Sequence, residues 1–122
     1  MARILLVDDE AGVRGFLKRG LELDSHSVET AVDGLDGLEQ LKAAGGSFTL
    51  LVSDIRMPLM DGIALAVAAK QEFPELIVLL MTGFADEQER IKGLENQVAD
   101  LLIKPFSLGD LRAAVRRALA RG

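Results

Sequence analysis

The sequence contains no cysteine, tryptophan or tyrosine, and its one histidine is His26. Without cysteine the chain cannot form disulfides, thiolate zinc sites, iron–sulfur clusters or a cysteine nucleophile. A single histidine argues against a multi-histidine metal site and an ordinary catalytic triad. No apolar run approaches transmembrane length, and the N-terminus turns acidic at Asp8, too early for a secretory signal. Any chemistry is therefore expected to use carboxylates, hydroxyls, lysines or a hard metal ion.

Basic residues are in the minority, with 14 Lys and Arg against 19 Asp and Glu, which gives a net charge of −5. Nucleic acids and anionic membranes attract proteins through a positive field, so we expect direct binding to neither. The length of 122 residues suits one domain, and 49% hydrophobic residues allow a sizeable core. We expect a cytoplasmic protein whose single domain covers residues 1–122.

Short β-favouring apolar runs alternate with segments of helical spacing. The runs are Arg3–Val7, Ser27–Val32, Thr49–Ser53, Leu76–Met81 and Ala99–Ile103. Four are almost continuously apolar, which favours strands covered on both faces, whereas Ser27–Val32 alternates and suits an edge strand. The order βαβαβαβαβα predicts an α/β fold with a five-stranded, doubly wound parallel sheet between two helical layers.

The helical segments differ in how strongly they are marked. Val13, Phe16, Leu17 and Leu21 form one apolar stripe, and Leu35, Leu38 and Leu41 form another. Asp86 to Asn96 has few apolar positions, so we expect a lightly packed, exposed helix there. Ser107 with Asp110 predicts a capped helix start, and Asp86 with Glu89 offers a similar one. Asp61-Gly62 predicts a turn and a further helix start.

Polar residues follow four of the predicted strands. They are Asp8, Asp9 and Glu10 after the first, Asp54 after the third, Thr82 after the fourth and Lys104 after the fifth. In an open parallel sheet these ends meet at one edge. Clustered carboxylates repel one another, and a hard cation such as Mg²⁺ relieves that cost. Carboxylates, a cation, a hydroxyl and a lysine together suit a phosphoryl group, with Asp54 as the best nucleophile.

Four motifs occur in order along these strand ends. They are Val7-Asp8-Asp9-Glu10, Asp54-Ile-Arg-Met-Pro-Leu-Met-Asp-Gly62, Met81-Thr82-Gly83 and Lys104-Pro105-Phe106. On these residues the chain resembles, along its whole length, the receiver domain of bacterial two-component response regulators. The resemblance is to the single-domain, chemotaxis-regulator-like kind, and it implies a (βα)5 flavodoxin-like sandwich with no output domain.

The resemblance also implies a role for each site residue. Asp54 is the phosphoacceptor, and Thr82 and Lys104 are the phosphate-sensing pair. Mg²⁺ is bound by Asp8, Asp9 and Asp54 together with the backbone carbonyl of Arg56. The Lys104–Pro105 peptide bond is expected to be cis.

The partners are implied in the same way. A sensor histidine kinase or a histidine phosphotransferase donates the phosphoryl group. The face formed by the fourth helix, fifth strand and fifth helix then switches toward an unknown downstream protein. The chain is expected to be a monomer or a weak phosphorylation-dependent dimer. It assists its own phosphorylation and dephosphorylation but is not a turnover enzyme.

Three positions depart from the family pattern or modify it. Leu101 stands where many receivers carry the aromatic switch residue, so the switch lacks its ring and hydroxyl. We hypothesise that Phe84 partly shields the acyl phosphate from water and slows its loss. The cation of Arg56 is expected either to contact the phosphoryl group or to pair with Glu10.

Other interpretations remain open. Asp8 and Asp9 could simply cap the first helix. The chain could be the receiver fragment of a longer transcriptional regulator. It could be an Asp-nucleophile phosphatase of the haloacid-dehalogenase type, although Arg56 stands where those enzymes carry a second acid. It could also be an adaptor that works without phosphorylation.

Overall fold

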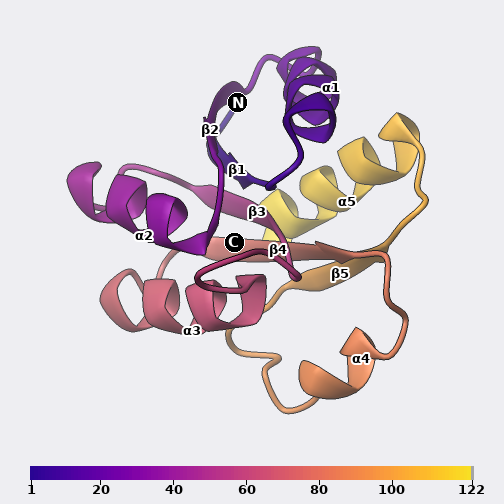
Figure 1. Cartoon of the computed structure of the whole chain (residues 1–122). Helices are drawn as coiled ribbons and strands as arrows, with labels where there is room; N and C mark the ends of the chain where they lie inside the picture. The colour runs from indigo at the N-terminus through magenta and orange to yellow at the C-terminus, as the bar shows by residue number, and fades with distance from the viewer. Residues whose placement is uncertain (122) are drawn as a thin grey trace.

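The computed structural model describes residues 1–121, in which five strands alternate with five helices (Figure 1). The strands are β1 (Arg3–Val7), β2 (Ser27–Ala31), β3 (Leu50–Asp54), β4 (Ile77–Thr82) and β5 (Asp100–Ile103). The helices are α1 (Ala11–Glu22), α2 (Gly34–Ala43), α3 (Gly62–Glu72), α4 (Glu87–Arg90) and α5 (Leu108–Arg121). The predicted order is confirmed, and every strand end lies within about one residue of its predicted place.

All five strands are parallel, and their order across the sheet is β2-β1-β3-β4-β5. The alternating strand β2 lies at an edge, as predicted. The chain leaves β1 toward β2 on one side and returns to β3 on the other, so the direction of winding reverses between β1 and β3. In doubly wound sheets this switch point is where ligands bind, beyond the carboxyl ends of the strands.

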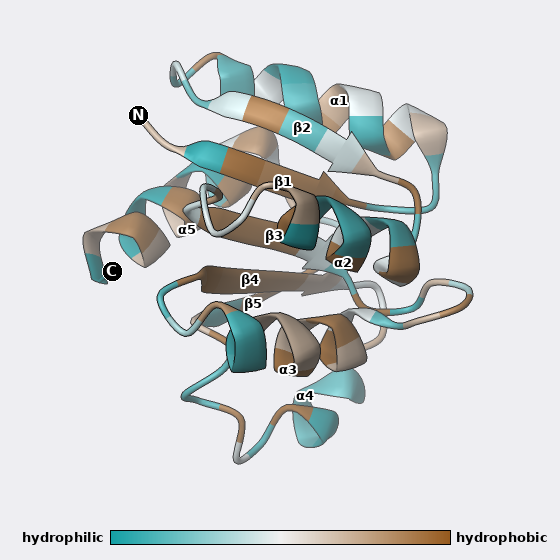
Figure 2. Ribbon diagram, turned by 90° about the vertical axis from the view of Figure 1, so that its left-hand side faces the viewer, coloured by the Kyte–Doolittle hydropathy of each residue, from teal (hydrophilic) through white to brown (hydrophobic). Residues whose placement is uncertain are grey.

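Helices cover both faces of the sheet, α1 and α5 on one and α2, α3 and α4 on the other (Figures 1 and 2). Successive β1 side chains enter opposite cores: Ile4 and Leu6 pack on the α1–α5 side, and Leu5 and Val7 on the α2–α3 side. All four are fully buried. The apolar runs are continuous because both faces are covered, which completes the predicted three-layer sandwich. Within residues 1–121, no helix is both long and apolar enough to cross a membrane.

The fourth helix differs from its prediction. The expected helix from Asp86 to Asn96 is reduced to the four residues of α4, and the chain continues in turns. Gly93 adopts a φ of +85°, a left-handed conformation that interrupts a helix. Asp86 is the N-cap of α4, so the predicted start is confirmed, but its side chain makes no capping hydrogen bond.

The other predicted helix starts are confirmed. Ser107 Oγ accepts the Asp110 N–H at 3.0 Å, and Asp110 Oδ2 accepts the Ser107 N–H at 3.2 Å. Asp61 caps α3 by accepting the Ala64 N–H at 2.8 Å. Two members of the predicted stripes, Phe16 and Leu35, are exposed rather than packed against the core.

Candidate functional site

The strand ends bring the predicted polar residues to one edge of the sheet. Asp54 and Thr82 are the last residues of β3 and β4, rather than the first residues after them as predicted. The register pairs Asp54 with Met81 and Thr82 with Ile103, so Lys104 follows directly beside Thr82. Asp8 follows β1, the other neighbour of β3. The predicted convergence is therefore present in the fold.

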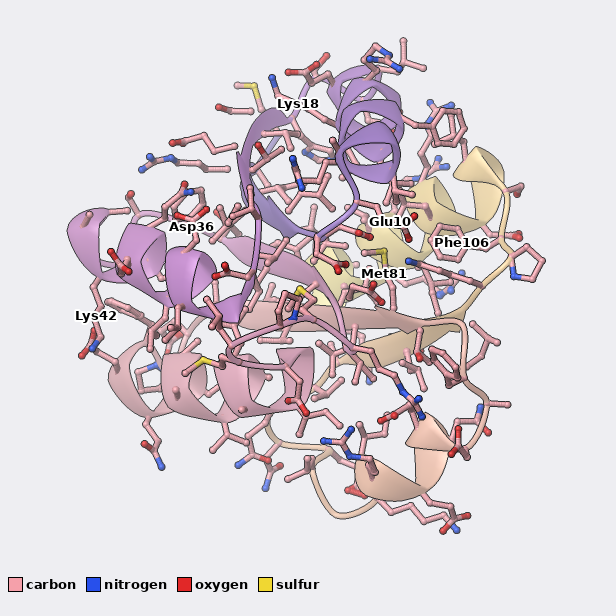
Figure 3. The ribbon with its side chains drawn as sticks, in the orientation of Figure 1. Glu10, Lys18, Asp36, Lys42, Met81 and Phe106 are labelled. Atoms are coloured by element: carbon pink, nitrogen blue, oxygen red, sulfur yellow. The ribbon has the colours of Figure 1, made fainter. Side chains whose placement is uncertain are left out.

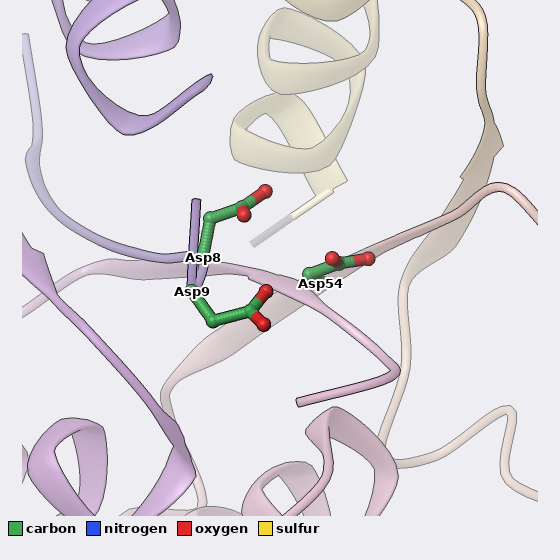
Figure 4. Close-up of side chains that lie close together, drawn as sticks. All are labelled: Asp8, Asp9 and Asp54. Carbon is green, nitrogen blue, oxygen red and sulfur yellow. The ribbon is translucent and has the colours of Figure 1, made fainter. Parts of the chain in front are cut away.

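Three carboxylates gather at this edge. Asp8, Asp9 and Asp54 each contribute an oxygen that lies within 4.8 Å of the others (Figure 4). Asp8 and Asp54 are buried, whereas Asp9 is exposed to solvent. Hard oxygen donors in a small, partly open cluster are the donor set that Mg²⁺ prefers in proteins.

Lys104 places a positive charge between two of these carboxylates. Its Nζ lies 3.3 Å from Asp8 Oδ2 and 3.4 Å from Asp54 Oδ2. Partial burial opposes the charged ammonium, but the carboxylates of Asp54 and Asp8 outweigh it and raise the pKa of Lys104. The position of this ammonium shows that the cluster favours a cation. The Lys104–Pro105 bond is cis, as the resemblance implied.

Asp54 is held in a fixed orientation but is costly to ionise. Its Oδ1 accepts the Ile55 N–H at 3.0 Å, and its Oδ2 faces Lys104. Burial raises its pKa, the nearby Asp8 charge adds to that rise, and Lys104 opposes it. An added cation would therefore favour the carboxylate form that a nucleophile needs.

Asp8 also shapes the chain that leads into α1. Its Oδ1 accepts the Glu10 N–H at 2.9 Å, and its backbone carbonyl accepts from Arg14 Nη1 at 2.7 Å. Glu10 is the N-cap of α1, and no side chain caps that helix. The interpretation of Asp8 and Asp9 as helix caps is therefore wrong, and Asp8 points one of its oxygens at Lys104 instead.

Thr82 and Phe84 lie on the loop after β4. Thr82 is buried, and its Oγ1 accepts the Phe84 N–H at 3.1 Å. Phe84 is 47% exposed, so a large part of its surface remains open to water. Leu101 is half-buried against the core on the α2–α3 side. Thr82 pairs with Ile103 in the sheet and so lies beside Lys104, which follows Ile103. Leu101 is neither fully buried nor fully exposed.

Arg56 has partners that the sequence did not reveal. Its Nε donates to Glu87 Oε1 at 2.9 Å, and its guanidinium carbon lies 3.6 Å from the centre of the Phe84 ring. The predicted pairing with Glu10 is wrong, because the loop after β3 turns toward α4. Glu87 itself was missed, since it lies in a charged run that reads as surface although its side chain is only 2% exposed.

A small cavity adjoins Lys104 on the α1 side. It has a volume of about 280 Å³ and is lined by Glu10, Val13, Phe16, Leu17, Lys104, Pro105 and Phe106. Figure 3 shows Glu10 and Phe106 near the start of α1 and the start of α5. An apolar hollow thus lies directly beside the polar cluster.

The comparisons with known proteins agree with this geometry. The family described as "Response regulator receiver domain" matches residues 4–116. The transcriptional regulatory protein PrrA of Mycobacterium tuberculosis is 36% identical over 119 residues, covering 98% of this chain and 50% of that protein. The response regulator MprA of Mycobacterium leprae is 38% identical over 119 residues, covering 98% of this chain and 51% of that protein. The chain therefore spans about half the length of the curated relatives it matches.

Solved structures give the same result. A response regulator receiver domain protein from Clostridium thermocellum superposes with a TM-score of 0.90 at 29% identity, covering 99% of this chain and 96% of that one. The response regulator protein TrrA from Thermotoga maritima, in complex with Mg²⁺–BeF, has a TM-score of 0.88 at 26% identity. That match covers 98% of this chain and 100% of the other.

Proposed function

This chain belongs to the response regulator receiver domain family, and we propose that it accepts a phosphoryl group on Asp54 and signals through altered protein contacts. The observation that carries the proposal is the position of Asp54. Its carboxylate lies at the switch point of the sheet, oriented by a backbone N–H and faced by Lys104. A partly buried positive charge beside a carboxylate nucleophile suits a reaction in which negative charge builds up on phosphoryl oxygens.

We propose that the acidic cluster binds Mg²⁺ through Asp8, Asp9, Asp54 and the backbone carbonyl of Arg56. The converging carboxylate oxygens support this, and the related TrrA was solved with Mg²⁺–BeF. When bound, the ion neutralises charge on the carboxylates and on the transferred group. The protein's own contribution is the fixed spacing of these donors.

The phosphoryl donor is proposed to be a phosphohistidine on a sensor histidine kinase or a histidine phosphotransferase. His26 precedes β2 and so lies at the amino edge of the parallel sheet, whereas Asp54 lies at the carboxyl edge. His26 Nδ1 accepts the Ala2 N–H at 3.0 Å and serves the fold there. The donor imidazole must therefore come from another protein, and we expect the exchange to take place in the cytoplasm.

In the transfer step, an Asp54 carboxylate oxygen forms a bond to phosphorus as the bond between phosphorus and the donor imidazole breaks. The imidazole nitrogen keeps the electron pair and takes up a proton. Lys104 and the Thr82 hydroxyl hold the phosphoryl oxygens in this proposal. Water later attacks phosphorus, the bond to Asp54 breaks, and the carboxylate and inorganic phosphate are released.

Fast turnover as a phosphatase is not favoured. Such an enzyme would need a proton donor near the nucleophile, and the residue two positions after Asp54 is Arg56, which is paired with Glu87. A guanidinium does not donate a proton at neutral pH. We therefore propose a phosphoacceptor that assists its own phosphorylation and dephosphorylation.

The output is proposed to be a change at the face formed by α4, β5 and α5, in a monomer or a weak phosphorylation-dependent dimer. A phosphoryl oxygen would draw the Thr82 hydroxyl away from the Phe84 N–H that it now accepts. Leu101, in the half-buried position on β5, would then repack without an aromatic ring. The downstream partner is proposed to be a protein rather than a nucleic acid.

A second candidate is a receiver that controls a DNA-binding output in a longer protein. The observation that favours it is the length of PrrA, named a transcriptional regulatory protein, of which this chain covers half. The length of the encoded gene product distinguishes the two candidates.

The phosphoacceptor proposal is tested by incubating the protein with Mg²⁺ and acetyl phosphate and measuring its intact mass. We expect one phosphoryl adduct in the wild type and none in Asp54→Asn. Asp33→Asn is the matched control, because Asp33 lies at the same sheet edge and asparagine caps α2 equally well. A wild-type protein that forms no adduct would instead support the adaptor.

A further inference from the structure

Glu87 is a buried acid outside the phosphoacceptor cluster. Apart from Asp8 and Asp54, it is the only buried charged residue among those that the structure describes. A carboxylate removed from water is costly unless it is paired and hydrogen-bonded. A buried Glu87 carboxylate therefore needs a partner for each of its oxygens.

Two arginines share the Glu87 carboxylate. Arg56 Nε binds Oε1 at 2.9 Å, and Arg90 Nη1 binds Oε2 at 2.8 Å. Arg90 also reaches Asp61 Oδ2 at 2.7 Å, so it is tied to α3 as well. If Arg56 left, Glu87 would still be paired with Arg90. Arg56 is thus the partner that can be released without leaving a buried charge alone.

Arg56 lies on the part of the loop nearest to the proposed phosphoacceptor. It follows Asp54 by two residues, and its guanidinium stacks on Phe84, whose N–H donates to Thr82 Oγ1. Its side chain is 48% exposed, which leaves it room to move. Asp54 is thus connected to Arg56 by two residues of chain, and Thr82 is connected to it through the stacking of Arg56 on Phe84.

Phosphorylation would add a competing anion. Converting the Asp54 carboxylate to an acyl phosphate adds about one negative charge at this edge. Guanidinium groups bind phosphoryl oxygens in a bidentate manner, whereas Glu87 accepts from Arg56 through one oxygen. Arg56 Nη2 also lies 3.8 Å from Asp86 Oδ2, but that carboxylate is 79% exposed, so Glu87 is the main competitor of the phosphoryl group for Arg56.

We propose, resting on the proposed function, that Glu87 is a positioning residue which holds Arg56 at α4 in the unphosphorylated protein. When Asp54 carries a phosphoryl group, Arg56 leaves Glu87 and binds the phosphoryl oxygens. The loop after β3 is thereby detached from α4, while Arg90 keeps Glu87 paired. Binding at Asp54 is weakened in the resting protein, because the competent position of Arg56 is only partly populated.

The test measures the Kd of beryllium fluoride, a phosphoryl mimic, in saturating Mg²⁺ by isothermal titration calorimetry. Glu87→Gln weakens the hydrogen bond to Arg56. We therefore expect beryllium fluoride to bind about tenfold more tightly, the change that corresponds to one charged hydrogen bond. Glu89→Gln is the matched control: it removes the same charge from the same helix, but its side chain is 74% exposed and paired only with Lys92. We expect its Kd to stay near that of the wild type.

A double-mutant cycle separates positioning from a general structural effect. In an Arg56→Gln background, Glu87→Gln should no longer tighten binding, because Arg56 is the group through which it acts. A tightening that persists in that background would overturn the proposal, and so would a Glu87→Gln protein that binds like the wild type.

A measurement without variants covers the case in which Glu87→Gln does not fold. In the wild type, the ¹⁵N resonance of the Arg56 Nε–H should shift on adding Mg²⁺ and beryllium fluoride. The Arg112 Nε–H, which donates to Asp24 at 3.0 Å, is the internal reference. Binding without an Arg56 shift would refute the positioning role alone, whereas a wild type that binds no beryllium fluoride would refute the proposed function as well.

Discussion

Replacing Gly62 with alanine tests how closely the start of α3 approaches the proposed phosphoacceptor. A Cβ at position 62 would lie 2.1 Å from the Asp54 carbonyl oxygen and 3.0 Å from both its carbonyl carbon and Ile55 Cα. The Gly62 N–H already donates to the Ile55 carbonyl at 2.7 Å. These neighbours are backbone atoms, which cannot rotate aside as a flexible side chain can. The end of β3 or the start of α3 must therefore move.

The magnitude follows from two opposing effects. Overpacking a well-packed site costs about 1–3 kcal/mol, and a contact with backbone at 2.1 Å belongs at the upper end of that range. Replacing glycine by alanine in a helix stabilises the folded state by about 1 kcal/mol, which offsets part of that cost. We expect Gly62→Ala to lower the free energy of unfolding by about 2 kcal/mol, and Tm by about 8 °C at roughly 4 °C per kcal/mol.

Gly12→Ala is the control for this experiment. Gly12 lies in α1, and no atom comes within 4 Å of the position of its added Cβ. The same substitution should therefore stabilise the protein by about 0.5–1 kcal/mol.

The assay combines urea denaturation, followed by circular dichroism, with the intact-mass measurement of phosphorylation. Gly62→Ala should be less stable and slower to form the adduct, since the Asp54 backbone is displaced. Gly12→Ala should be more stable and react at the wild-type rate. If Gly62→Ala unfolds at or above the wild-type urea concentration and reacts normally, the close approach does not constrain Asp54.

Three further predictions concern the charges and caps. Because the pKa of Asp54 is raised above its usual 3.8, its ionisation disfavours the fold, so this contribution to stability falls as pH rises through the raised value. Asp54→Asn should then be more stable than the wild type at pH 7, with the difference lost below pH 3.8, as pH-dependent urea melts would show. Lys104→Met leaves Asp8 and Asp54 without their cation and should cost about 1–3 kcal/mol in the free energy of unfolding; a neutral result in the same melts would contradict the pairing. Ser107→Ala removes the α5 cap and should cost about 1 kcal/mol, whereas Ser107→Asp, read by thermal unfolding, should retain most of it.

The fold and the composition of the site could be predicted because their signals are local. Continuous apolar runs identify strands that are covered on both faces. The residues at the ends of these strands are then expected at the carboxyl edge of the parallel sheet. Asp54, Thr82 and Lys104 were found in this way, although the exact strand ends were off by one residue. The Ser107 and Asp61 caps were found for the same reason, since each cap bonds within its own first turn.

The surroundings of Arg56 could not be predicted. Whether this arginine would meet Glu10 or Glu87 depends on the course of the loop after β3, to which no local pattern contributes. The charged run around Glu87 is typical of a solvent-exposed surface, whereas the buried Glu87 carboxylate is paired with two arginines from different segments.

The α/β fold and the set of residues that meet at the carboxyl edge of the sheet could both be predicted from the amino-acid sequence alone. Both follow from the hydrophobic periodicity of each segment and from the alternation of strands and helices along the chain. The shortness of α4, the position of Lys104 between Asp8 and Asp54, and the pairing of Arg56 with Glu87 became known only from the folded structure. Those outcomes are set by contacts between groups far apart in sequence, where burial and charge compensation act together.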